Sequence, residues 1–180
     1  MGRSASKVVP NPTVWTAVGL LFAVLAFAFY CGGHQAAGGL LLAVSGFFDI
    51  IDGAVARATG RTSQRGAFLD STLDRVSEVL VFVGILVGAY VSPLLVVLAL
   101  SSSLLVSYTR AKGDALGVNL AGKGIGERSE RLLVLIVSSI LGIVGLGVIL
   151  VAVLALVTFV QRTVAVSGAL GQREHPSASP

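Results

Sequence analysis

The stretch FFDIIDGAVARATGRTSQRGAFLDSTLDR, residues 47–75, carries four aspartates between strongly apolar flanking segments. Asp49 and Asp52 precede its polar centre, and Asp70 and Asp74 follow it. Aspartates spaced three or four residues apart share one face of a helix. The short polar segment 58–66 makes the two flanking helices antiparallel neighbours, so that all four carboxylates can converge. The stretch therefore predicts a helical hairpin with a shared acidic site.

The composition of the whole chain is that of a membrane protein. Hydrophobic residues make up 54% of the 180 residues and charged residues only 12%, whereas about a quarter of the residues in a soluble domain are charged. The mean hydropathy is +0.90. We therefore expect nearly all of the chain to lie in the lipid bilayer, with no large soluble domain and no nucleic acid as a partner.

The apolar segments predict an all-α, polytopic integral membrane protein with six transmembrane helices. Each span needs about 20 apolar residues, or fewer where its ends are polar. The first four spans are expected at about 12–30, 35–57, 63–90 and 93–112, the fifth starts near Glu130, and the sixth ends near Gly168. We expect one domain over residues 1–171 and a disordered tail at 172–180.

The last two spans have an alternative. The uncharged segment between Arg131 and Arg162 is short for two spans and a turn, and one strongly tilted helix is the alternative. Gly142, Gly145 and Gly147 favour a turn, and arginines at helix ends can extend their charged groups to the membrane surface. We therefore favour two helices.

The basic residues predict the orientation in the membrane. All 13 lysines and arginines fall in the N-terminal segment, in the connections after the second and fourth spans, or after the last span. The positive-inside rule then places both termini and the acidic site on the cytoplasmic side of the cell membrane. His34 falls on the opposite side, so we expect no catalytic role for it.

The four aspartates predict a site for a divalent cation. An aspartate at the centre of a membrane helix costs roughly 3 kcal/mol even on the lenient scale, and clustered carboxylates repel one another. Solvated helix ends, or pairing with Arg57, Arg61 and Arg75, would account for one or two of the four. A ligand set of oxygens alone suits a hard ion, with Mg²⁺ first and Mn²⁺ or Ca²⁺ as alternatives.

The residues around the aspartates predict a pyrophosphate site at the membrane surface. Gly53 allows close backbone approach, and Arg57, one turn further on, can bind a phosphate through two hydrogen bonds. Thr62 or Ser63 is a natural N-cap for the third span, and a helix N-terminus attracts anions. The segment 11–13, Asn-Pro-Thr, resembles a second such helix start.

The pattern Asp49-x2-Asp52-Gly53-x2-Ala56-Arg57-x8-Gly66-x3-Asp70-x3-Asp74 resembles the complete signature of the CDP-alcohol phosphotransferase family. The six helices of that family would cover nearly the whole chain. The resemblance implies an integral membrane enzyme, commonly a homodimer. Such an enzyme moves a phosphoalcohol from a CDP-linked lipid to the hydroxyl group of an acceptor and releases CMP.

The resemblance also implies a role for each matching position. The four signature aspartates would be the metal ligands, and Asp74 would also be the general base that takes the proton of the acceptor hydroxyl. The acceptor would attack in line with the departing CMP, so that positioning and electrostatics do most of the work. The residues implied to bind the CDP-lipid are Asn11, Pro12, Thr13, Thr16, Gly53, Ala56, Arg57, Ser63 and Gly66.

A cluster of cations predicts that the acceptor carries a phosphate. Arg128 and Arg131 are three residues apart and share a helical face, while Arg110 and Lys112 sit at the facing helix end. Several cations directed at one place suit a dianion. Topology-determining charge, or contact with anionic lipids, is the alternative interpretation.

Two segments point to a branch of the family. SYTRAKGDALG (107–117) and GERSERL (126–132) resemble the branch that uses inositol phosphate, with Ser129 where that branch has proline. Arg162 is a further candidate for the acceptor site. We therefore expect inositol 1-phosphate as the acceptor, with glycerol 3-phosphate as the alternative. The lipid is left open between CDP-diacylglycerol and CDP-archaeol.

A divalent-cation transporter is the alternative from another functional class, because aspartates within a membrane also mark ion paths. A path needs polar groups through the full depth of the bilayer. The half of this chain opposite the aspartates offers no charge and almost no polar groups, which disfavours transport.

Overall fold

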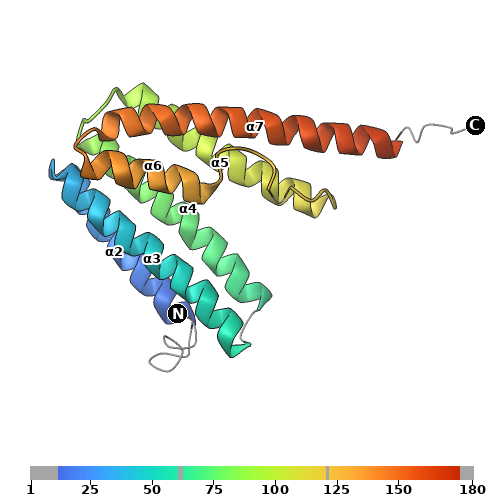
Figure 1. Cartoon of the computed structure of the whole chain (residues 1–180), viewed down its shortest axis with the longest axis horizontal. Helices are drawn as coiled ribbons and strands as arrows, with labels where there is room; N and C mark the ends of the chain where they lie inside the picture. Colours follow the sequence, from blue (N-terminus) through green and yellow to red (C-terminus); the bar gives the residue numbers. More distant parts are fainter. Residues whose placement is uncertain (1–11, 61–62, 121, 175–180) are drawn as a thin grey trace, which may run out of the picture.

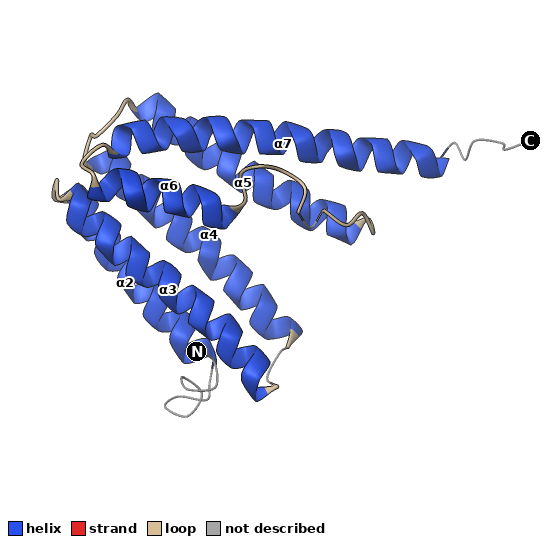
Figure 2. Ribbon diagram, in the orientation of Figure 1, coloured by secondary structure: helices blue, strands red, loops and turns tan. Residues whose placement is uncertain are grey.

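The computed structural model describes residues 12–60, 63–120 and 122–174, and within these ranges every regular element is a helix (Figures 1 and 2). This confirms the predicted all-α class. The helices are α2 (Pro12–Cys31), α3 (Gln35–Thr59), α4 (Gln64–Val87), α5 (Pro93–Ala115), α6 (Arg128–Ile140) and α7 (Val144–Glu174).

Local sequence signals account for several of the helix ends. Ser63, one of the two predicted candidates, is the N-cap of α4, and its side chain accepts a hydrogen bond from the backbone N–H of Gly66 at 3.0 Å. Gly60 closes α3 in the left-handed conformation, with φ of 64°, which glycine adopts at little cost. Pro93 lies in the first turn of α5, where its missing N–H leaves no bond unmade.

The uncharged segment near the C-terminus forms two helices rather than one. A turn follows Ile140, and Gly142 has φ of +78° there, so the prediction of two helices is confirmed. The predicted start of the tail was wrong in one respect, because α7 continues through Glu174 and residues 172–174 are helical. The remainder of that tail lies outside the described residues.

Four of the helices are long and apolar enough to cross a membrane, judged by length and composition: α2, α3, α5 and α7. Helix α4 carries the charged residues of the acidic site, and α6 has 13 residues, a length of only about 20 Å at 1.5 Å per residue. The number of six spans therefore stays a prediction.

The helices form two diverging groups, with α2, α3 and α4 in one and α5 and α7 in the other, while α6 packs against both α3 and α7 (Figure 1). Helix α2 packs closely against both α3 and α4. The expected direct neighbours α3 and α4 hardly touch each other, because α2 fills the position that the sequence had suggested for α4. Space is thereby left between α3 and α4 beside the aspartates.

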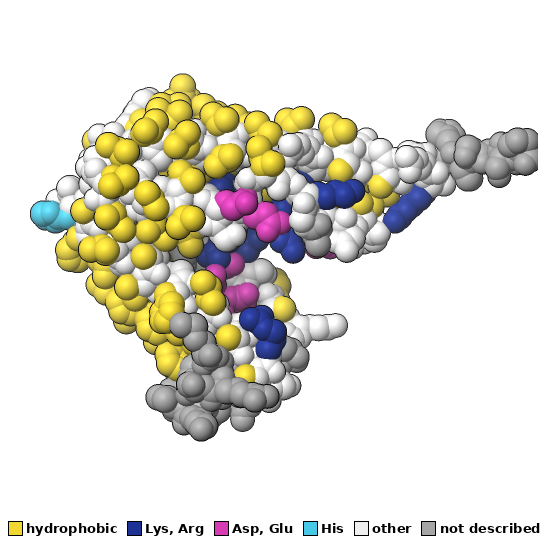
Figure 3. Space-filling model, in the orientation of Figure 1, with side chains coloured by type: hydrophobic (Ala, Val, Ile, Leu, Met, Phe, Trp, Pro, Cys, Tyr) yellow, Lys and Arg dark blue, Asp and Glu magenta, His cyan; other side chains and the backbone are white. Residues whose placement is uncertain are grey.

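The apolar core lies where the two groups meet. Tyr30, Phe82 and Ile85 are fully buried there, and the Tyr30 hydroxyl is 2.7 Å from Oγ of Ser139. Gly84 allows α2 and α4 to approach closely, since a Cβ at this position would lie 2.9 Å from the carbonyl oxygen of Phe27. On the face drawn in Figure 3, hydrophobic side chains cover this end and charged side chains gather in the hollow between the diverging helices.

Candidate functional site

Three aspartates from two helices come together in this hollow. Asp49 of α3 and Asp70 and Asp74 of α4 each offer a carboxylate oxygen, and these oxygens all lie within 4.8 Å of one another. The three side chains are partly buried. The predicted convergence is therefore realised for three of the four signature aspartates.

Asp52 lies outside this group of three. It is one turn beyond Asp49 on α3 and 6% exposed. Its Oδ2 accepts a hydrogen bond from the Thr16 hydroxyl of α2 at 2.7 Å. The hydroxyl supplies a donor to a buried carboxylate, and it ties Asp52 to a residue that the sequence had assigned to the CDP-lipid site.

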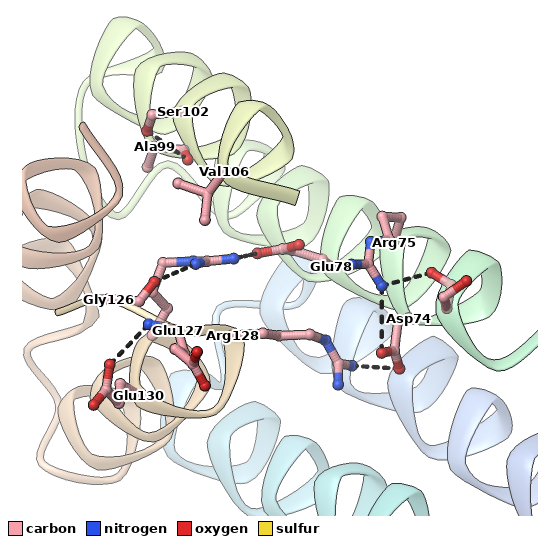
Figure 4. A network of polar contacts seen from close by, with 12 residues as sticks. Asp74, Arg75, Glu78, Ala99, Ser102, Val106, Gly126, Glu127, Arg128 and Glu130 are labelled. Atoms are coloured by element: carbon pink, nitrogen blue, oxygen red, sulfur yellow. Dashed lines mark hydrogen bonds and ion pairs between the residues drawn. The ribbon is translucent and has the colours of Figure 1, made fainter. Parts of the chain in front are cut away.

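Arg128 bridges the two helices that carry the acidic group, and Figure 4 shows its contact with Asp74. Its Nη1 lies 2.8 Å from Oδ2 of Asp49, and its Nη2 lies 2.8 Å from Oδ1 of Asp74. Asp74 has a second, longer contact of 3.5 Å with Nη1 of Arg75. Sequence reasoning placed Arg128 with the acceptor, and it did not anticipate this contact with two of the proposed metal ligands.

The three carboxylates fit a divalent cation. The Oδ1 atom of Asp70 is buried and has no hydrogen-bond partner among the described residues. A buried carboxylate oxygen without a partner is costly, and a cation held between neighbouring carboxylates removes that cost. The donor set is oxygen only, which is what Mg²⁺, Mn²⁺ and Ca²⁺ prefer.

A first cavity, of about 210 Å³, lies between α2, α3 and α4 beside the acidic group. Asp52 and Asp70 form its acidic wall. A side chain at Gly53 would crowd Arg57, since a Cβ at position 53 would lie 3.3 Å from Nη1 of Arg57. Residues predicted to bind the CDP-lipid line the remainder: Thr13, Thr16, Gly53, Ala56, Arg57, Ser63 and Gly66. Asn11 lies outside the described residues, and Pro12 begins α2.

A second cavity, of about 510 Å³, lies on the other side of the acidic group, between α4, α5, α6 and α7. Asp70 lines both cavities, whereas Asp74 lines only this one of the two. Four of the five cations predicted to bind the acceptor line it: Arg110, Arg128, Arg131 and Arg162. Lys112 is exposed at the end of α5 and is not part of this lining.

Three of these arginines already have partners within the protein: Arg128 with Asp49 and Asp74, as described above, and also Arg162 and Arg131. Arg162 is buried, and its Nε donates to the carbonyl oxygen of Lys123 at 2.8 Å while its Nη2 lies 3.5 Å from Glu127. Arg131 is also buried and pairs with Glu78 at 3.4 Å. Arg110 is exposed and has no ion pair with any residue in the described ranges.

The first turn of α6 is fixed by a reciprocal cap. Glu127 is the N-cap, and its backbone N–H donates to Oε2 of Glu130 at 2.7 Å. This arrangement satisfies backbone N–H groups that have no partner within the helix. It also fixes the first turn of α6, which begins at Arg128 (Figure 4).

Sequence reasoning missed two charged residues of the site, Glu78 and Glu127, whereas Arg75 had been weighed as a partner of the aspartates and contacts Asp74. A signal existed for Glu78, because it follows Asp74 by four residues and therefore lies on the same face of α4. A signal also existed for Glu127, since Glu-x-x-Glu before an apolar run is compatible with a capping box. Both residues contact arginines that line the second cavity.

Known proteins are similar to this chain in sequence and in structure over most of its length. Archaetidylinositol phosphate synthase of Pyrococcus horikoshii is 39% identical over 163 residues, which cover 90% of this chain and 86% of that protein. The crystal structure of Mycobacterium tuberculosis phosphatidylinositol phosphate synthase with CDP-DAG bound matches with a TM-score of 0.81 at 30% identity, over 92% of this chain and 90% of that one.

A second crystal structure of the Mycobacterium tuberculosis enzyme, in complex with manganese and citrate, matches with a TM-score of 0.82 at 30% identity, over 92% of this chain and 87% of that one. The sequence model of the CDP-alcohol phosphatidyltransferases matches residues 9–160, which include both groups of signature aspartates. The chain belongs to the CDP-alcohol phosphatidyltransferase family.

Proposed function

We propose that this protein transfers the phospholipid group of a CDP-linked lipid to a hydroxyl of a phosphorylated polar alcohol, most readily inositol 1-phosphate, and releases CMP. The observation that carries the proposal is the meeting of two cavities at one acidic group. One cavity is lined by the signature residues and the other by arginines, and Asp70 lines both. The names of the relatives support inositol phosphate as the acceptor.

The first cavity suits a CDP-linked lipid. Arg57 is exposed at its edge and offers two parallel N–H groups to a phosphate. The N-terminus of α4, capped by Ser63, adds a partial positive charge. We assign CDP-lipid contacts to Asn11, Pro12, Thr13, Thr16, Gly53, Ala56, Arg57, Ser63 and Gly66. A relative bound to CDP-DAG supports this assignment.

We assign the divalent cation to Asp49, Asp70 and Asp74, with Asp52 beside them on the wall of the first cavity. Mg²⁺ is the first candidate and Mn²⁺ the alternative, which is supported by the manganese complex of the Mycobacterium tuberculosis enzyme. When bound, the cation neutralises charge on the pyrophosphate and on the departing CMP.

Asp74 is proposed as the base that accepts the proton of the acceptor hydroxyl. It lines the arginine-rich cavity and does not line the cavity assigned to the CDP-lipid, whereas Asp70 faces both. A base must lie within hydrogen-bond reach of the proton that it takes. The position of Asp74 beside the acceptor cavity therefore favours it over Asp70 for this role.

The acceptor phosphate is assigned to Arg110, Lys112, Arg128, Arg131 and Arg162. Among those that line the second cavity, Arg110 is the most available, since it is exposed and has no ion pair within the described ranges. Charge alone would also accept glycerol 3-phosphate, so this alcohol stays the alternative acceptor. Free inositol and serine lack the phosphate that these cations would bind.

A divalent-cation transporter is disfavoured by where the polar groups lie. The charged side chains gather at the open end of the molecule (Figure 3), and the opposite end is filled by a core that includes Tyr30, Phe82 and Ile85. An ion path would need polar groups through this core.

The protein is a membrane protein. We propose that it has six spans and an active site that faces the cytoplasm, that it lies in the cell membrane, and that it assembles as a homodimer.

The purified protein in detergent tests the proposal. It is incubated with CDP-diacylglycerol or CDP-archaeol, Mg²⁺ and one acceptor at a time, and CMP release is followed. Inositol 1-phosphate should give the fastest release, glycerol 3-phosphate a slower one, and free inositol and serine little. CMP release that is fastest with free inositol or serine would overturn the assigned acceptor, and no release with any acceptor would overturn the proposed reaction.

A further inference from the structure

Arg131 is buried beside the acceptor cavity with only one carboxylate in reach. It is 2% exposed, its Nη1 donates to the carbonyl oxygen of Gly126 at 2.6 Å, and its Nη2 lies 3.4 Å from Oε1 of Glu78 (Figure 4). Among the described residues, Glu78 is the single carboxylate within ion-pair distance of Arg131. A buried guanidinium without a counter-charge is strongly unfavourable, so the position of Arg131 depends on Glu78.

A small cavity lies behind this ion pair. Both Glu78 and Arg131 line it, together with Ser45 and Ser77, and its volume is about 30 Å³. Oε2 of Glu78 and Nε of Arg131 are buried and have no hydrogen-bond partner among the residues that the structure describes. Its wall is mostly apolar, but the polar groups of Glu78, Arg131, Ser45 and Ser77 lie in it. A cavity of this size with several polar partners accommodates one ordered water, which would complete the contacts of both side chains.

Glu78 and Arg131 differ in which cavities they reach. Arg131 lines both the small cavity and the large acceptor cavity, whereas Glu78 lines only the small one of these two. Glu78 also lies outside the group of three carboxylates that could hold a metal ion. The carboxylate of Glu78 therefore contacts Arg131 on the side of the small cavity and lines neither the acceptor cavity nor the group of three carboxylates.

We propose that Glu78 is a positioning residue for the acceptor: it fixes the guanidinium of Arg131 at the wall of the acceptor cavity without touching the acceptor itself. This inference rests on the proposed function, because it concerns the acceptor of that reaction. The pair is formally neutral, so Arg131 contributes directed N–H donors rather than net charge. The two terminal nitrogens of a guanidinium carry four N–H groups, and those that the contacts to Gly126 and Glu78 do not use are available to a phosphate.

A double-mutant cycle tests the inference through the KM for inositol 1-phosphate at saturating CDP-lipid and Mg²⁺. Glu78→Ala should raise this KM roughly tenfold, the size expected when one charged hydrogen bond is no longer directed at the phosphate, and should leave the KM for the CDP-lipid within about twofold. In an Arg131→Ala background, Glu78→Ala should cause no further rise, because Glu78 acts only through Arg131.

Two further variants separate this role from a general loss of structure. Val79→Ala removes a partly buried neighbour on α4 that lines none of the cavities described above, and it should leave the acceptor KM unchanged. Glu78→Gln fills the same space without the charge. If Glu78→Ala does not fold, Glu78→Gln replaces it in the cycle. Glu78→Gln should raise the acceptor KM at least about threefold, and it should cause no further rise in the Arg131→Ala background.

The outcomes distinguish this inference from the proposed function. The positioning role would be overturned if Glu78→Ala raised the acceptor KM by the same factor with and without Arg131. It would also be overturned if Arg131→Ala raised the acceptor KM and Glu78→Ala did not. If the wild-type protein releases no CMP with any acceptor, the proposed function fails. The same cycle, measured as thermal stability in detergent, then still shows whether Glu78 and Arg131 are coupled, and additive losses of stability would overturn the pairing.

Discussion

Replacing Arg128 with alanine is expected to tighten divalent-cation binding while it weakens acceptor binding. Arg128 contacts Asp49 and Asp74 at 2.8 Å each, and these two carboxylates belong to the group of three that could hold a metal ion. A guanidinium and a divalent cation therefore compete for the same oxygens. The arginine side chain is only 25% exposed, so solvent screens this competition only partly.

The magnitude follows from the two contacts. A hydrogen bond between charged groups contributes about 1.5–3 kcal/mol. If a bound cation displaces at least one of the two contacts, its affinity in the wild-type protein is reduced by that amount, which is roughly ten- to a hundredfold. Arg128→Ala removes the competitor, and the dissociation constant for Mn²⁺ should fall by this factor.

The assay is Mn²⁺ binding to the purified protein in detergent, without substrates, followed by electron paramagnetic resonance. Arg75→Ala is the matched control, because Arg75 makes a single, longer contact of 3.5 Å with Asp74 and is 34% exposed. We expect it to change the Mn²⁺ affinity by less than about threefold, as weak exposed ion pairs contribute little. The reasoning is refuted if Arg128→Ala leaves Mn²⁺ binding unchanged or weakens it, since Arg128 would then hold the carboxylates in place for the cation.

Three further predictions concern the carboxylates and the acceptor cations. Asp70→Asn should abolish transfer in a protein that remains folded, and EDTA should abolish it reversibly in the wild-type protein, because the ligand charge or the cation is lost; full CMP release in EDTA would contradict the metal assignment. Asp74→Asn should lower kcat by at least about a hundredfold, the low end for a general base, with little change in CDP-lipid binding; near-normal turnover would mean that another group takes the proton. Arg110→Ala should raise the KM for inositol 1-phosphate about tenfold, the contribution of one charged hydrogen bond, without a matching change in the KM for the CDP-lipid. Lys112→Ala should raise the acceptor KM less, because Lys112 lies outside the cavity lining. A larger effect of Lys112→Ala than of Arg110→Ala would place the acceptor phosphate nearer the end of α5.

The sequence predicted the helices well because their signals are local. The apolar lengths located α2, α3 and α5 to within a few residues, and Ser63 was found as an N-cap from its position before an apolar-periodic run. Gly142 indicated the turn that divides α6 from α7. Hydropathy, capping and glycine conformation each depend on residues within one or two helical turns, so no knowledge of the fold was needed.

Much of the site was also accessible from the sequence, because a signature of fixed spacing brings residue types to one helical face. Seven of the nine residues assigned to the CDP-lipid by resemblance are found around one cavity, and four of the five acceptor cations are found around another. Spacing along single helices could not show that Asp49, Asp70 and Asp74 form the compact group while Asp52 pairs with Thr16.

The sequence by itself determined the helical class and the apolar segments, since these follow from composition and from the helical period, and the spacing of its motifs supplied the candidate site residues. Only the tertiary structure decided which partners they have. Thr16 meets Asp52 across 36 residues, Glu78 meets Arg131 across 53, and Asp49 meets Arg128 across 79. Such contacts depend on how α2 packs between its neighbours and where the cap of α6 fixes its first turn, and helix packing of this kind is set by the shapes of distant side chains rather than by any local period.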